Sequence, residues 1–297
     1  MGATVRLATA LVGTTLLVGA AVVLVVQTRA GEVVYRTESD FNTIIVTEDQ
    51  QGIRTLRFEE YGARQSVVKL GDPDYLALPY AKAVHVGLAL PENPKRVLVV
   101  GLGGGTIPQF LRRHFPDLMI DAVEIDPVVV QVAKTYFGLD PDDKLRVFVA
   151  DGREFIERSE PIYDAIYLDA YSADSVPYAL TTREFLQATR KALTPDGVVV
   201  GNVWSSRSNK LYDSMIRTYQ DVFEQVAVND VRGVGNKIVI AAAGGKPLTK
   251  DEVAARSASL ASRGKFPYDL REIVEEGYHL LDKPDEKGEV LRDQPSP

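Results

Sequence analysis

A short glycine-rich run is the first feature of the sequence that could do chemistry. Gly101, Gly103 and Gly105 follow the apolar segment RVLVV, and Thr106 begins a stretch with helical spacing of apolar residues. Glycine lets the backbone approach a ligand closely, and the first turn of a helix presents N–H groups without partners inside the helix. A glycine-rich turn is a weak signal alone, but its place between a strand and a helix favours nucleoside binding.

Two acidic residues follow at the ends of the next two predicted strands. Glu124 can accept hydrogen bonds from both hydroxyls of a ribose. Asp151, followed by Gly152, can accept the amino group of an adenine, although Asp-Gly also forms ordinary turns. A dinucleotide fingerprint would have Gly or Ala at position 106, where this chain has Thr106. The pattern therefore favours a nucleoside that carries a positively charged sulfur over a pyrophosphate.

A third acid, Asp169, ends the predicted strand YDAIYL, next to the expected position of the donor sulfur. A carboxylate there can orient an amine, stabilise its positive charge or accept its proton. The alternative is a cap of the loop that follows. Tyr171 offers an aromatic face to a cation, and Asp174 could join an acidic pocket. Tyr80 is a further candidate for substrate binding, although Tyr80 and Trp204 would more often be core residues.

These residues must be positioned by alternating strands and helices. From residue 94 the pattern is an apolar strand, a turn, a helix and another strand, repeated several times, which predicts a doubly wound Rossmann-like α/β sheet. Residues 31–72 read as a small antiparallel β-domain, and residues 73–244 as the catalytic domain. Residues 245–297 read as a helical, partly disordered C-terminal tail. Residues 1–30 form a separate hydrophobic segment.

That N-terminal segment includes twenty residues without a charge, 7–26, between Arg6 and Arg29. As a helix it would span about 30 Å, the thickness of a bilayer core. The pattern predicts either a membrane anchor or a signal peptide cut near residue 30. The length of the apolar run favours the anchor. A donor nucleoside made in the cytosol would then place the catalytic domain on the cytosolic side, whereas cleavage would imply an exported protein.

Composition narrows the classes of ligand. The net charge of −7 argues against nucleic acid as a partner and favours a cationic substrate such as an amine. The chain has no cysteine, which excludes disulfides, thiolate catalysis and Cys-ligated metals. No metal is expected, because the three histidines are scattered as His85, His114 and His279.

Several motifs in order make the stretch from about 39 to 243 similar to the spermidine synthases and their non-polyamine relatives. The motifs are SDFNTIIVTE, GIRTLRF, RVLVVGLGGG, DAVEIDP, VFVADGREFI and YDAIYLDAY. The resemblance implies a class I methyltransferase sheet with a donor of the S-adenosylmethionine type. It puts Asn42 where the family has a glutamine near nucleoside and substrate, Glu124 on the ribose, Asp151 on the adenine side and Asp169 as the base. Relatives pair through the β-domain, so a homodimer could form.

Two departures bear on the reaction. Spermidine synthases follow their glycines with an aspartate that binds the aminopropyl ammonium, and Thr106 takes that place here. Their Tyr-His-Glu element, which holds the diamine, is replaced by Leu78-Pro79-Tyr80-Ala81. The pattern is closer to the methyltransferase-like members, such as the C-terminal domain of the eukaryotic enzyme that methylates translation elongation factor one-alpha. An acid would repel the carboxylate of an intact S-adenosylmethionine, whereas a hydroxyl and free N–H groups would accept it.

Three hypotheses follow. The first is methyl transfer from S-adenosylmethionine to a small-molecule amine, a protein or a similar nucleophile. The second is an aminopropyltransferase that uses decarboxylated S-adenosylmethionine to make a polyamine. The third is a non-catalytic module that only binds the nucleoside.

Overall fold

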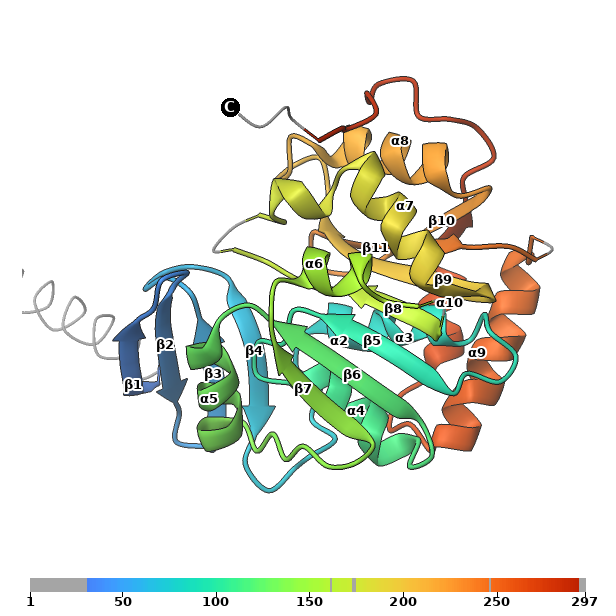
Figure 1. Cartoon of the computed structure of the whole chain (residues 1–297). Helices are drawn as coiled ribbons and strands as arrows, with labels where there is room; N and C mark the ends of the chain where they lie inside the picture. Colours follow the sequence, from blue (N-terminus) through green and yellow to red (C-terminus); the bar gives the residue numbers. More distant parts are fainter. Residues whose placement is uncertain (1–30, 161, 173–174, 246, 294–297) are drawn as a thin grey trace, which may run out of the picture.

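The computed structural model describes residues 31–160, 162–172, 175–245 and 247–293, and two β-sheets build this part of the chain (Figure 1). The smaller sheet is antiparallel, in the order β1-β2-β3-β4. Its strands are β1 (Glu32–Glu38), β2 (Thr43–Glu48), β3 (Ile53–Arg57) and β4 (Arg64–Lys69). Asp49 closes the β2–β3 turn, because its Oδ1 accepts the N–H groups of Gln51 at 2.8 Å and Ile53 at 3.0 Å. The antiparallel sheet predicted from the sequence is confirmed.

The larger sheet has eight strands in the order β12-β10-β11-β9-β8-β5-β6-β7. The strands are β5 (Arg96–Val100), β6 (Met119–Glu124), β7 (Leu145–Val149), β8 (Tyr163–Leu168), β9 (Leu193–Trp204), β10 (Gln225–Asp230), β11 (Asn236–Ala242) and β12 (Tyr278–Leu280). The five strands from β5 to β9 pair in parallel, and β10, β11 and β12 join them by antiparallel pairing. The predicted Rossmann-like sheet is confirmed.

Helices cover both faces of this sheet. They are α2 (Pro79–Ala83), α3 (His85–Leu88), α4 (Thr106–His114), α5 (Pro127–Tyr136), α6 (Gly152–Glu157), α7 (Arg183–Ala192), α8 (Tyr212–Val222), α9 (Lys250–Gly264), α10 (Leu270–Gly277) and the 3-10 helix η1 (Tyr178–Leu180). Side chains of α3, α4, α9 and α10 form one core with the sheet, and those of α6, α7 and α8 form the other. On β5, Val97 and Val99 enter the first core while Leu98 and Val100 enter the second, so the whole segment must be apolar.

The small sheet packs against α5. Ile44, Val46 and Leu56 form a third core with Val129 and Val132, and Figure 1 shows the blue strands beside this green helix. A buried polar contact joins the same two parts, since the Ser39 hydroxyl donates to Asp126, the N-cap residue of α5, at 2.5 Å. The small sheet is therefore fixed to the helix that follows β6.

Residues 245–293 contribute two helices and an edge strand. Val253, Leu260, Leu270 and Val274 are buried in α9 and α10, and β12 pairs with β10 at the sheet edge. The sequence indicated helices here but not the strand.

The segment predicted as a membrane anchor, 7–26, belongs to residues 1–30, which lie outside the described residues. Across the described ranges, no helix combines the length and the apolar character needed to cross a membrane. The described residues therefore give no support to the expected membrane-anchored protein with a cytosolic catalytic domain.

Candidate functional site

A cavity of about 300 Å³ lies at the carboxyl ends of the parallel strands. Strands β5, β6, β8 and β9 end at it, and β4, α2 and η1 complete its walls. This is the edge of an open α/β sheet where ligands usually bind. Nine residues proposed from the sequence line it, namely Asn42, Tyr80, Gly101, Gly103, Glu124, Asp151, Gly152, Asp169 and Tyr171.

Two proposed residues, Gly105 and Thr106, are not brought to this cavity. Gly105 is the N-cap residue of α4, with a φ of 72°, and the turn leaves the cavity after Gly103. Thr106 is the first residue of α4, and its hydroxyl is buried without a hydrogen-bond partner among the described residues. Asp174 lies outside the described residues.

Gly101 brings the glycine-rich turn against the end of β8. A Cβ at this position would lie 2.4 Å from the carbonyl oxygen of Asp169, and the φ of 89° is itself unfavourable for other residues. Backbone hydrogen bonds fix the approach, since the Asp169 N–H donates to the carbonyl of Val100 at 2.8 Å. The turn and Asp169 are therefore held next to each other.

Ser66, on β4, holds the other side of the turn. Its hydroxyl accepts the N–H of Gly104 at 2.8 Å, and a Cβ on Gly103 would lie 2.8 Å from that hydroxyl oxygen. The small sheet thus forms part of the cavity wall. The sequence pattern gave no sign of this contact, because nothing local relates β4 to a turn so far along the chain.

Glu124 presents a fixed carboxylate at the end of β6. One oxygen accepts the N–H of Leu102 at 2.9 Å, and the other accepts the N–H of Asp126 at 3.1 Å. Burial raises the pKa of Glu124, and these backbone N–H groups partly offset the rise. Each oxygen keeps a further lone pair, so the group can accept the two hydroxyls of a ribose.

Asp151 has a structural role as well as a place in the cavity. It is the N-cap residue of α6, and its Oδ1 accepts the N–H groups of Arg153 at 2.8 Å and Glu154 at 3.0 Å. A Cβ on Gly152 would lie 2.5 Å from the side chain of Val100, so the start of α6 packs closely on β5. The capping role accounts for part of what the sequence suggested for Asp151.

Asp169 lies half-buried at the floor of the cavity. Burial raises the pKa of its carboxyl to about 7, against the lowering effect of a hydrogen bond from Asn202. Asn202 Nδ2 donates to Asp169 Oδ1 at 2.7 Å, and Asn202 Oδ1 in turn accepts from Asn236 Nδ2 at 2.9 Å. Together the two bonds direct the N–H group of the Asn202 amide to the acid and its oxygen to Asn236. A carboxyl with this pKa can exchange a proton near neutral pH.

Three aromatic residues stand around Asp169. The Tyr171 hydroxyl donates to the carbonyl of Asn202 at 3.0 Å, and the Tyr80 hydroxyl donates to the carbonyl of Gln65 at 3.2 Å. Burial, and secondly the charge of Asp169, raise the pKa of both phenols, so they stay protonated. Trp204, 6.4 Å from Tyr171 between ring centroids, also lines the cavity. Reading Trp204 as a core residue was therefore wrong.

The cavity residues that the sequence reasoning missed include Arg64, Ser66, Asn202 and Asn236. Asn202 had a readable signal, because it is a polar residue inside the apolar run GVVVGNVW. A buried amide in such a strand requires a partner. Among the described residues, no group of three or more His, Asp or Glu side chains could hold a metal ion.

Comparisons with known proteins show the family to which the sequence is similar. A family model of the spermine/spermidine synthase domain matches residues 80–233. A polyamine aminopropyltransferase of Vibrio vulnificus is 38% identical over 197 residues, which cover 64% of this chain and 65% of that protein. A bovine eEF1A lysine and N-terminal methyltransferase is 38% identical over 186 residues, covering 57% of this chain and 26% of that protein. The chain thus spans less than two thirds of either relative.

A solved structure is similar as well. Human methyltransferase-like protein 13, in complex with SAH, superposes with a TM-score of 0.54 at 32% identity, over 69% of this chain and 96% of that one. The sequence is therefore similar to proteins of two named activities, and the fold is shared with a solved methyltransferase-like protein.

Proposed function

The chain belongs to the spermine/spermidine synthase domain family and is a transferase, and on this premise we propose that it moves the methyl group of S-adenosylmethionine to an amine or a similar nucleophile. The activity, the substrates and the partners of the whole protein are part of the proposal. The human neighbour whose structure contains SAH, the demethylated form of this donor, supports the choice of donor.

In this proposal the donor lies along the carboxyl edge of the sheet. Glu124 accepts the ribose hydroxyls, Asp151 and Gly152 face the adenine, and the glycine-rich turn at Gly101 brings the sulfonium close to Asp169. The fixed carboxylate of Glu124 and the contact between Gly101 and Asp169 support this order. Asn42 faces the cavity from the loop before β2 and is a further candidate for donor contact.

The position of Arg64 is the observation that favours methyl transfer over aminopropyl transfer. Its exposed side chain lines the cavity, two residues before the serine that holds the glycine-rich turn. Its guanidinium forms no ion pair with any residue that the structure describes. A guanidinium binds a carboxylate and repels an ammonium. The intact donor has a carboxylate on its amino-acid arm, whereas the decarboxylated donor keeps only the ammonium, so Arg64 favours the intact one.

The residues around Asp169 suit an amine acceptor. Tyr80, Tyr171 and Trp204 offer aromatic faces to a cation, and Asp169 can accept the proton that the amine loses. The amine nitrogen then attacks the methyl carbon in line, and the carbon–sulfur bond breaks with its electron pair left on sulfur. The protein contributes mainly alignment, because the sulfonium is already a good leaving group.

Calorimetric titration of the full chain with S-adenosylmethionine and with its decarboxylated form tests the proposal. We expect tighter binding of the intact donor, by about 10-fold or more, from one charge-assisted contact. Tighter binding of the decarboxylated donor would replace methyl transfer by aminopropyl transfer, the second candidate, which the Vibrio vulnificus relative favours.

The substitution Asp169→Asn tests the third hypothesis, a non-catalytic module that only binds the nucleoside. This substitution should reduce turnover by at least 100-fold and leave the affinity for S-adenosylmethionine within about 3-fold of the original. If the unmodified protein binds the donor tightly but turns over with no amine or protein acceptor, the module replaces the enzyme.

A further inference from the structure

The last described residues cross the molecule and end beside the cavity. We call residues 281–293 the C-terminal strap. It runs along α8, where Asp285 donates its N–H to Gln220 at 2.7 Å and Leu291 donates its N–H to the Thr218 hydroxyl at 2.9 Å. Leu291 is 9% exposed and lies in the core that α6, α7 and α8 share. The strap is therefore hydrogen-bonded to α8 at both of these points and is anchored in the core by Leu291.

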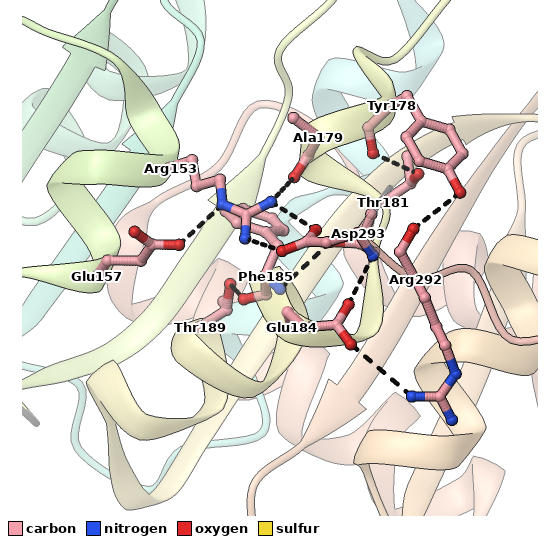
Figure 2. A network of polar contacts seen from close by, with 11 residues as sticks. Arg153, Glu157, Tyr178, Ala179, Thr181, Glu184, Phe185, Thr189, Arg292 and Asp293 are labelled. Carbon is pink, nitrogen blue, oxygen red and sulfur yellow. Dashed lines mark hydrogen bonds and ion pairs between the residues drawn. The ribbon is translucent and has the colours of Figure 1, made fainter. Parts of the chain in front are cut away.

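The strap ends in an ion pair with α6. Arg153 Nη1 and Nη2 donate to the two carboxylate oxygens of Asp293, at 2.8 and 2.5 Å. The same guanidinium donates to Glu157 at 2.8 Å through Nε and to the carbonyl of Ala179 at 3.2 Å through Nη1 (Figure 2). Its side chain is 22% exposed, so this is a two-pronged, partly buried contact rather than an ordinary surface pair.

The strap also contacts η1 and α7 directly. The Tyr178 hydroxyl donates to the carbonyl of Arg292 at 3.0 Å, and the Asp293 N–H donates to Glu184 at 2.9 Å (Figure 2). Three separate segments, α6, η1 and α7, are thus joined through two consecutive residues of the strap.

Two of these segments form walls of the cavity. Asp151 and Gly152, at the start of α6, line it on one side, and Pro177, Ala179 and Leu180 of η1 and its approach line it next to them. Arg153 follows the first pair directly and holds the carbonyl of Ala179. Its side chain is thus a direct polar link between these two walls.

We propose that Arg153 is a positioning residue of the donor cavity, and that Asp293 of the C-terminal strap holds it so that η1 stays in place as a wall beside the adenine. The inference rests on the proposed function, since it takes the cavity as the donor site. The donor then binds well only when the strap is docked, although the strap does not touch the cavity itself.

Four variants of the full chain test this inference: Arg153→Met, Arg153→Lys, Asp293→Ala and the control Arg158→Met. Arg158 lies at the end of the same helix, where it pairs with Glu154, and its side chain is 79% exposed. We expect Arg153→Met and Asp293→Ala to weaken binding of SAH by about 5- to 20-fold, because η1 is then no longer held in place as a wall of the cavity. Arg153→Lys should be intermediate because it keeps the charge but not the fork, and Arg158→Met should bind normally.

Hydrogen exchange of the ligand-free protein gives a second readout that does not depend on the donor. In η1 the N–H of Leu180 donates to Pro177 and that of Thr181 to Tyr178, and these amides should exchange faster in Arg153→Met and Asp293→Ala. Amides of β5 to β8 should be unchanged, which excludes global unfolding.

Unchanged exchange in η1 would overturn the inference, as would faster exchange with unaltered affinity for SAH. A loss of equal size in Arg158→Met would also overturn it. If the original protein binds no SAH, the proposed function fails instead, and the exchange result still decides whether Arg153 holds η1.

Discussion

Asn202 donates a hydrogen bond to Asp169 at 2.7 Å, and this bond opposes the effect of burial on the acid. Burial raises the pKa of Asp169 to about 7, whereas the Asn202 amide, by binding the ionised form, lowers it. The balance leaves a carboxyl with a pKa close to neutral pH. An acid in that state can take up the proton of an acceptor amine and return it to water afterwards.

Asn202→Ala should therefore shift the pH dependence of the reaction. Without the amide the pKa of Asp169 rises further, so the rising limb of the rate profile moves to higher pH by about one unit. Asn236→Ala keeps the Asn202 amide but removes the hydrogen bond that Asn236 donates to it. This variant should therefore give a smaller shift in the same direction. Rates measured from pH 5.5 to 9 provide the check. A profile that stays in place in both variants would mean that Asp169 does not carry the proton.

Asp169→Asn should stabilise the protein while it removes activity. Because the folded-state pKa of about 7 is above the unfolded value near 3.8, the folded state binds the proton more tightly. The stability of the original protein therefore falls as the pH rises from about 4 to about 7. Asp169→Asn has no such fall in stability with rising pH. Its melting temperature should therefore exceed that of the unmodified protein by a few degrees at pH 8, and by less at pH 5. An equal difference at both pH values would contradict the shifted pKa.

Arg64→Met should separate ligands by their carboxylate. SAH has the amino-acid arm, and 5′-methylthioadenosine lacks it but keeps the nucleoside and the sulfur. We expect the variant to bind SAH about 10-fold more weakly and 5′-methylthioadenosine as before. The control is Arg57→Met, because Arg57 lies close enough to Arg64 for the two charges to interact but does not line the cavity. Equal weakening of both ligands by Arg64→Met would exclude a contact with the carboxylate.

Gly101→Ala and Gly71→Ala should differ although both glycines have a positive φ, of 89° and 79°. A Cβ at position 71 meets nothing within 4 Å, so only backbone strain of about 1 kcal/mol is expected. At position 101 the Cβ lies 2.4 Å from the carbonyl oxygen of Asp169, and either the turn or the end of β8 must move. We expect Gly101→Ala to lower the free energy of unfolding, measured in urea, by about 3 kcal/mol or more. The soluble fraction of this variant should not bind the donor. Similar losses at both positions would show that strain alone matters.

Much of the sheet could be predicted because its signals are local. In β5 the four residues after Arg96 are all apolar, since their consecutive side chains enter two different cores. Glu124 and Asp169 could also be predicted from a local signal, because an acid at the end of a buried parallel strand lies at the edge where ligands bind.

The remaining features depend on contacts between distant segments. Ser66 holds Gly104 only because the small sheet packs on α5, and no local pattern contains that relationship. Thr106 was proposed for the donor, but the turn leaves the cavity after Gly103 and the Thr106 hydroxyl is buried. The strand β12 has three residues, too few for a periodic signal, and is defined by its pairing with β10.

The aromatic residues around Asp169 differ in one respect from the residues assigned to the donor. Tyr80, Tyr171 and Trp204 project from the first turn of a helix, from a loop and from the last residue of a strand, and all three are half-buried. Replacing one of these side chains changes the shape of the cavity without moving the glycine-rich turn, whereas a Cβ on Gly101 would displace the turn itself. Under the proposed function, the same scaffold could therefore be altered to take a different acceptor while its way of holding the donor stays as it is.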